Sequence, residues 1–228
     1  ISLNGSSHDT LVDNYIGTNP SGTAAIANGG NGILLTDGAA ANEIGGTAFT
    51  DTSTGAVNDP TGDKGQATPV FVVPPLGNLV SGDAGNGILI EDNSQNNILN
   101  GNFVGTTANG DAALGNALDG VDINGANNNA LIGCQAQDNP FIYYNVASGN
   151  GENGLQITDS NNIVVHANFF GVGANNSTVI GNGLNGILVD GSSQNVQVGG
   201  IIPLGNVSAG NGQNGIEVTD TAGGFTTF

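Results

Sequence analysis

Aspartates recur at a regular place along this chain, four or five residues after the glycine of an Asn-Gly dipeptide. The residues that share this place are Asp37, Asp92, Asp159, Asp190 and Asp220. Clustered carboxylate oxygens are ligands that Ca²⁺ prefers, so one hypothesis is that calcium bridges some of these side chains. The alternative is that aspartate stands there because its side chain bonds nearby backbone amides and favours turns. The sequence leaves both interpretations open and predicts no other cofactor.

Side chains that commonly perform catalysis are scarce in this chain. It has no arginine, one lysine (Lys64) and two histidines, His8 and His166, which lie far apart in the repeats described below. No serine, histidine and aspartate come together by register, so a hydrolase here would have to rely on a pair of carboxylates. The sequence therefore favours a protein that is not an enzyme.

Charge excludes further classes of function. The chain has 19 acidic residues and a net charge of −18. Nucleic-acid binding is excluded because phosphates are held by Lys and Arg. Anionic lipid surfaces and uronate-type sugars would be repelled for the same reason. The sequence contains no apolar run long enough to cross a membrane, so we expect no membrane insertion.

The elements that carry these residues repeat along the chain. An Asn-Gly or Asp-Gly dipeptide recurs, apart from one longer gap, about every 30–34 residues, the signature of a solenoid. After each dipeptide an apolar, a variable and a second apolar residue follow, which predicts a strand with one buried face. The predicted inward pairs are Ile33/Leu35, Ile88/Ile90, Val121/Ile123, Leu155/Ile157, Ile187/Val189 and Ile216/Val218.

The motifs of one lap resemble a known kind of repeat. They are Asn-Gly-Ile-Leu-Ile at 86–90, the Asn-Asn turn at 96–97, and Gly-Asn-Phe-Val-Gly-Thr at 101–106 with its Gly-Asp-Ala-Ala-Leu-Gly-Asn loop at 110–116. This resembles the parallel β-helix repeats of large secreted and cell-surface bacterial proteins, in the pectate-lyase-like superfamily. The resemblance implies an all-β, right-handed parallel β-helix with three short strands per coil. We expect one domain over 1–228, with 47–71 as an inserted surface loop.

Two further structural expectations follow from the repeats. Asparagines before the second strand of each lap should form a side-chain amide ladder along the axis. They are Asn42, Asn97, Asn129, Asn162 and Asn195. Tyr15, Phe103 and Phe169 repeat in register and are expected in the core, and Cys134 is expected to be a buried thiol.

The enzymes of the resembled superfamily are polysaccharide lyases, hydrolases and epimerases, but their catalytic motifs are missing here. The superfamily's sites would need a basic residue beside acidic ligands, an Asp-Asp pair, or Asp-Pro-His. The chain has no Asp-Asp, and its only Asp-Pro, Asp59-Pro60, is followed by Thr61. The catalytic residues of the superfamily therefore cannot be transferred to this sequence.

The expected function is that of a non-enzymatic structural solenoid, extracellular or at the cell surface. It would be a segment of a longer surface protein or a subunit of a fibre whose copies stack end to end. One alternative is an adhesin that binds glycans. Another is a carbohydrate-active enzyme that uses carboxylates on the outer strand face, where Asp122, Gln156 and Glu217 are the polar candidates.

Overall fold

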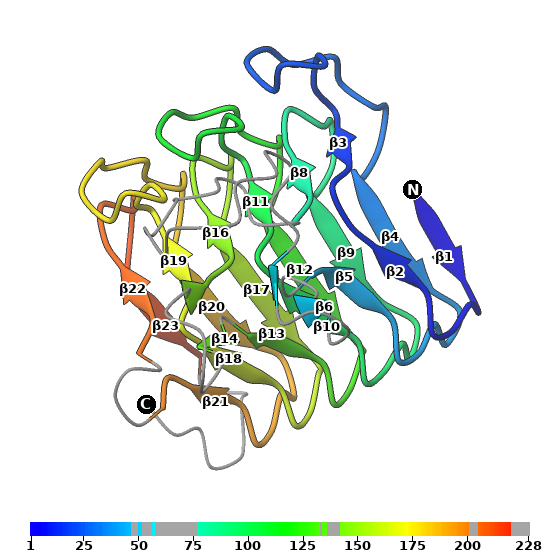
Figure 1. The fold of residues 1–228 in the computed structure, drawn as a ribbon. Coiled ribbons are helices and arrows are strands. Elements are labelled where there is room, and N and C mark those ends of the chain that lie inside the picture. Colours follow the sequence, from blue (N-terminus) through cyan, green and yellow to red (C-terminus); the bar gives the residue numbers. More distant parts are fainter. Residues whose placement is uncertain are drawn as a thin grey trace.

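The chain folds into a parallel β-helix, as the repeats predict (Figure 1). The computed structural model describes residues 1–46, 50–51, 56–57, 77–132, 134–135, 142–200 and 205–219. Its strands fall into three long parallel sheets, and each coil gives one strand to each sheet in turn. The predicted all-β parallel β-helix with three short strands per coil is thereby confirmed.

The first sheet has seven strands and starts each coil. In sheet order they are β1 (Ser2–Asn4), β4 (Ile33–Thr36), β9 (Ile88–Ile90), β12 (Val121–Asn124), β17 (Leu155–Thr158), β20 (Ile187–Asp190) and β23 (Ile216–Val218).

The second and third sheets have six strands each. The second contains β2 (Thr10–Leu11), β5 (Glu43–Gly45), β10 (Ile98–Asn100), β13 (Ala130–Ile132), β18 (Val164–His166) and β21 (Gln197–Val198). The third contains β3 (Tyr15–Ile16), β8 (Leu79–Val80), β11 (Phe103–Val104), β16 (Val146–Ala147), β19 (Phe169–Phe170) and β22 (Val207–Ser208).

Two short antiparallel pairs interrupt the coils. β6 (Thr50–Asp51) pairs with β7 (Ala56–Val57), and β14 (Cys134–Gln135) pairs with β15 (Ile142–Tyr143). The first pair falls within the predicted insert 47–71, most of which lies outside the described residues. The side chain of Cys134 and all of Asp220 also lie outside them. The single domain and the insert boundaries stay predictions.

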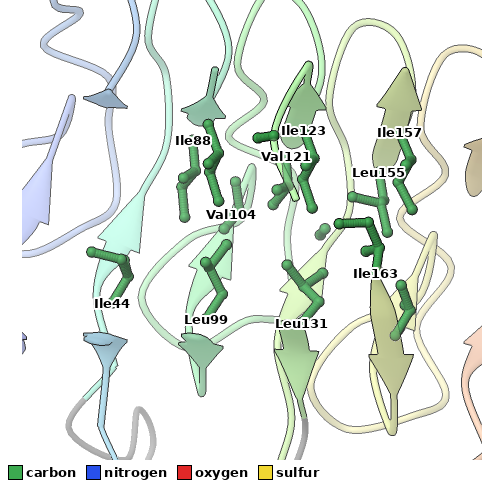
Figure 2. Close-up of a cluster of buried hydrophobic side chains, with 14 of the residues drawn as sticks. Ile44, Ile88, Leu99, Val104, Val121, Ile123, Leu131, Leu155, Ile157 and Ile163 are labelled. Atoms are coloured by element: carbon green, nitrogen blue, oxygen red, sulfur yellow. The ribbon is translucent and has the colours of Figure 1, made fainter. Parts of the chain in front are cut away.

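The main core is a set of aliphatic columns between the sheets. All the predicted inward pairs of the first sheet are buried, except Ile216 and Val218 in the last described coil. The second sheet contributes Ile44, Leu99 and Leu131, which face them in Figure 2. In-register pairing puts like residues above one another at the strand spacing of about 4.8 Å. Burial of these columns is the main driving force for coiling.

A second, smaller core lies on the outer face of the third sheet. Leu79, Phe103 and Val146 form its centre, and Ala108, Ala174, Tyr144 and Phe169 pack against them. Tyr144 stacks on Phe169 with ring centroids 4.2 Å apart. The predicted core position is thus correct for Phe103, but Tyr15 is 40% exposed. Both side chains point to the outer face, because the next residue in each strand, Ile16 or Val104, faces the main core. Tyr15 is more exposed because β3 is the edge strand of the third sheet and has a neighbouring strand on one side only.

Long loops from alternate coils cover this second core. Each loop is a hairpin closed by an antiparallel bridge, as at Thr106↔Ala113. Their tips are joined directly, since Ala108 N donates to Gly22 O at 2.9 Å and Ala174 N donates to Gly110 O at 2.9 Å. A Cβ on Gly22 would lie 2.6 Å from Ala108 Cβ, so this contact needs glycine.

No described helix is long and apolar enough to span a membrane.

Candidate functional site

The outer face of the first sheet carries Asp122, a partly buried carboxyl group with a strongly raised pKa. Strand alternation turns the residues between the inward pairs towards the outer face of the sheet. The resulting row is Ser2, Leu34, Leu89, Asp122, Gln156, Leu188 and Glu217. Asp122 and Gln156 are direct neighbours, whereas Leu188 separates Gln156 from Glu217. The structure therefore brings together two of the three polar candidates.

Asp122 has only one of its carboxyl oxygens bonded. Its Oδ2 accepts a hydrogen bond from Asn86 Nδ2 at 3.2 Å. Its Oδ1 is buried and has no partner among the described residues. The pKa of Asp122 is raised to about 7, chiefly by burial and next by the negative charge of Asp119, while the bond from Asn86 opposes the rise. Asp122 is thus a carboxyl group that can be protonated near neutral pH.

The groups beside Asp122 are occupied by internal hydrogen bonds. Asp119 Oδ1 accepts from Asn153 N at 2.7 Å and from Asn153 Nδ2 at 2.9 Å. Burial raises the pKa of Asp119, and these two bonds oppose the rise. Gln156 accepts from Asn153 Nδ2 at 3.2 Å and donates to Thr158 Oγ1 at 3.1 Å. Within the part of the chain that the structure describes, the site therefore offers Asp122 as a proton donor beside groups that internal hydrogen bonds already hold.

The aspartates of the calcium hypothesis occupy two different registers. Asp37, Asp92 and Asp159 share a left-handed turn position, with φ of 55°, 53° and 49°. Gly125 and Gly191 take that position in the coils on either side of Asp159. Asp190 lies one residue earlier, in β20, where it pairs with Thr158. Among the described aspartates of this set, only Asp37 and Asp92 are thus in register with each other.

These aspartates also bond within the protein. Asp92 Oδ2 accepts from Thr36 Oγ1 at 2.8 Å, Asp190 Oδ1 accepts from Thr158 Oγ1, and Asp159 Oδ1 accepts from Ser192 N at 2.7 Å. Within the described residues no group of three His, Cys, Asp or Glu side chains is arranged to hold a metal ion. All three bonds join adjacent coils and none closes a local turn, so the turn-forming role and calcium binding both stay predictions.

The two histidines do not meet. His8 is in a turn of the first coil with φ of 62°, and His166 ends β18 in the fifth strand of the second sheet. Burial lowers the pKa of His166, which favours its neutral form.

Most asparagine side chains are used in ladders that run along the helix axis. In the third-strand ladder each residue donates its backbone N–H and a side-chain N–H to the Oδ1 of the next. Its members are Asn14, Asn78, Asn102, Asn145, Asn168 and Asn206. The second side-chain N–H bonds a backbone carbonyl, as from Asn102 to Ile44 O at 2.8 Å. Each such asparagine therefore satisfies buried polar groups in its own and adjacent coils.

Two more long ladders flank the long and short loops. The loop ladder comprises Asn28, Asp83, Asn116, Asn150, Asn182 and Asn211. The Asn-Gly ladder comprises Asn31, Asn86, Asp119, Asn153, Asn185 and Asn214. The sequence analysis did not predict the third-strand ladder, the loop ladder or the Asn-Gly ladder. The available signal was the asparagine that opens every third strand and every repeat dipeptide.

The predicted second-strand ladder is correct for only part of its length. Asn42, Asn97 and Asn129 bond in series inside the protein. Asn162 and Asn195 lie one residue earlier and form an exposed series with Asn128. Ile163 and Val196 take the buried places instead. A shift of one residue moves a side chain from the inside to the outside of a strand, and that shift ends the buried ladder.

Asp83 is an aspartate in the place of an asparagine. Its Oδ1 accepts from Asn28 N at 3.1 Å and Asn28 Nδ2 at 2.7 Å, as an asparagine's would. Its Oδ2 is buried and without a partner among the described residues. This oxygen lies beside Gly32 as Asn116 Nδ2 lies beside Gly87 and Asn150 Nδ2 beside Gly120. Burial raises the pKa of Asp83, which favours the protonated form that could donate like an amide.

Solved structures share this fold at low sequence identity. A point mutant of the periplasmic alginate epimerase AlgG has a TM-score of 0.57 and 15% identity, over 97% of this chain and 39% of that one. A double mutant of the same epimerase has a TM-score of 0.55 and 14% identity, over 99% of this chain and 44% of that one. This chain thus spans less than half the length of these epimerases. No family model and no curated protein matches it.

Proposed function

We propose that this chain is a non-enzymatic structural β-solenoid of an extracellular or cell-surface protein. One observation carries the proposal, namely the continuous amide ladders that link each coil to the next. In a solenoid each coil contacts only its neighbours, so stiffness depends on the bonds between adjacent coils. The side-chain amides of the ladder asparagines are used to hold the coils together.

Composition supports the same function. A net charge of −18 makes neighbouring solenoids repel one another laterally. With a single cysteine, the fold also contains no intrachain disulfide that a reducing environment could break. The proposal includes end-to-end association with further coils, of a longer chain or of another copy. The inward residues Ile216 and Val218 in the last described strand of the first sheet are 40% and 38% exposed, and another coil would cover them.

The proposal is tested by incubating the purified chain with a panel of neutral and acidic polysaccharides, alginate among them. We expect no new reducing ends, no unsaturated products and no change in uronate configuration. The matched variant is Asp122→Asn, which removes the carboxyl whose pKa is raised to about 7. Catalytic turnover by the wild type that is lost in this variant would overturn the structural function.

The second candidate is carbohydrate chemistry at the outer face of the first sheet. It is favoured by Asp122, a protonatable carboxyl beside Gln156, and by a fold shared with alginate epimerases. Against it stand the absence of arginine from the sequence and the internal bonding of Asp119. A glycan-binding adhesin is separated from both by a glycan array, where saturable binding without turnover would support it.

A further inference from the structure

The chain contains many Asn-Gly steps, which are chemically fragile. They begin at Asn4, Asn28, Asn31, Asn86, Asn100, Asn109, Asn124, Asn150, Asn153, Asn182, Asn185, Asn211 and Asn214. In such a step the glycine nitrogen attacks the asparagine Cγ, a new C–N bond closes a cyclic imide, and the side-chain nitrogen leaves as ammonia. Water then opens the imide to aspartate or isoaspartate. Glycine favours the reaction because no side chain hinders its nitrogen.

The interior ladder positions oppose this reaction at the asparagine side chain. Asn182 is 2% exposed. Its Nδ2 donates to Ala147 O at 3.0 Å and Asn211 Oδ1 at 2.9 Å, and its Oδ1 accepts from Asn150 N and Nδ2, both at 3.1 Å. Gly183 N donates to Asn150 O at 2.9 Å, but the glycine nitrogens that follow Asn4, Asn109 and Asn124 are hydrogen-bonded as well. The interior positions therefore differ from these three in the burial and the bonds of the asparagine side chain. Rotation of Cγ towards Gly183 N would break the side-chain bonds of Asn182 together.

Asn153 is held in the same way in the Asn-Gly ladder. It is 1% exposed, its Nδ2 donates to Asp119 and Gln156, and its Oδ1 accepts from Asn185 N and Nδ2. Gly154 N donates to Asn185 O at 3.0 Å.

Other Asn-Gly steps lie outside the ladders and are exposed. Asn109 is at a long-loop tip, where its Oδ1 accepts only local bonds, from Thr107 Oγ1 at 2.6 Å and Asp111 N at 3.3 Å. Asn4 and Asn124 end β1 and β12 with exposed side chains, before glycines with φ of 59° and 60°.

We propose that the ladders direct spontaneous deamidation of the folded chain to Asn4, Asn109 and Asn124 and block it at interior positions such as Asn153 and Asn182. The repeat can then use Asn-Gly turns in a long-lived protein, because the dipeptide that makes the turn also closes the ladder that protects it. The inference is independent of the proposed function, since it concerns covalent lifetime.

The test follows each site with time in the intact chain. The folded protein and a urea-unfolded sample are incubated in mildly alkaline buffer, digested with pepsin in acid, and analysed by mass spectrometry. Normalised to the unfolded rates, Asn153 and Asn182 should react at least roughly tenfold more slowly than Asn109 and Asn124, the factor expected from breaking even one or two net hydrogen bonds. Equal normalised rates at the two kinds of site would overturn the proposal.

A matched pair of variants tests the ladder itself. Asn211→Ala removes the acceptor of Asn182 N and Nδ2 and should speed deamidation at Asn182 about tenfold. Asn214→Ala changes the same coil but leaves Asn182 fully bonded, so the rate at Asn182 should stay at the wild-type value. Circular dichroism checks that both variants are folded. An unchanged rate at Asn182 in folded Asn211→Ala would show that the ladder is not the protecting element.

Discussion

Replacing Asp122 by asparagine should change how the stability of the solenoid depends on pH. The fold raises the pKa of this carboxyl from 3.8 to about 7, chiefly by burial. The folded state therefore prefers the protonated form, while the unfolded chain ionises normally. Below the unfolded pKa both states hold the proton and the group has no effect on stability. As pH rises towards 7 the unfolded state alone loses its proton, and stability falls.

The size of the effect follows from the shift. A difference of about three pKa units corresponds to a loss of about 4 kcal/mol in the free energy of unfolding between acid and alkaline pH. Asparagine keeps a bond with Asn86 but places either an N–H or an oxygen in the buried, unpartnered position of Oδ1. We therefore expect a gain of about 1–3 kcal/mol at pH above 7, and little change or a small loss in acid.

The assay is equilibrium urea denaturation of the wild type and Asp122→Asn across the range from acid to mildly alkaline pH. The control is Asp13→Asn, which removes one exposed carboxyl between β2 and β3 without touching the first sheet. Parallel stability curves for the wild type and Asp122→Asn at all pH values would refute the reasoning, because they would mean that Asp122 ionises alike in both states.

Three further predictions concern the ladders and the aspartates. Asp83→Asn supplies the N–H missing from the loop ladder and should add about 1 kcal/mol to the free energy of unfolding at neutral pH, and less in acid, where Asp83 can itself donate a proton; a loss of stability in urea denaturation at neutral pH would contradict this. Asn102→Ala removes the side-chain partner of Asn78, Ile44 and Asn145 and should lower the free energy of unfolding by about 3–5 kcal/mol. The exposed control Gln197→Ala should lower it by less than about 0.5 kcal/mol. Equal melting temperatures for the two variants would show that the ladder adds nothing. Calcium bound by the turn aspartates should raise the melting temperature and be reversed by chelator, most of all through the neighbouring Asp37 and Asp92; a melting curve unaffected by calcium or chelator would leave them as turn residues only.

The sequence alone determined the coil and the direction of its strands' side chains. The Asn-Gly dipeptides and the alternation after them predict the inward pairs, such as Ile88/Ile90 and Leu155/Ile157, because period two assigns each residue to a face without further information. The absence of arginine and the single lysine likewise restrict the chemistry before any coordinates are considered.

Only the tertiary structure decided what each polar side chain meets in the neighbouring coil. In sequence, nothing distinguishes the hydrogen bonding of Asp83 and Asp119 from that of other acidic residues. In the structure both lie in asparagine ladders and accept hydrogen bonds from asparagine amides. Asn162 fits the ladder pattern in sequence, yet a shift of one residue turns it outward and buries Ile163. Asp122 is recognisable as outward-facing, but its raised pKa depends on Asp119, Asn86 and the burial supplied by adjacent coils. The physical reason is that strand direction is set by local alternation, whereas hydrogen bonding and desolvation are set by residues about thirty positions away that the coil brings into contact.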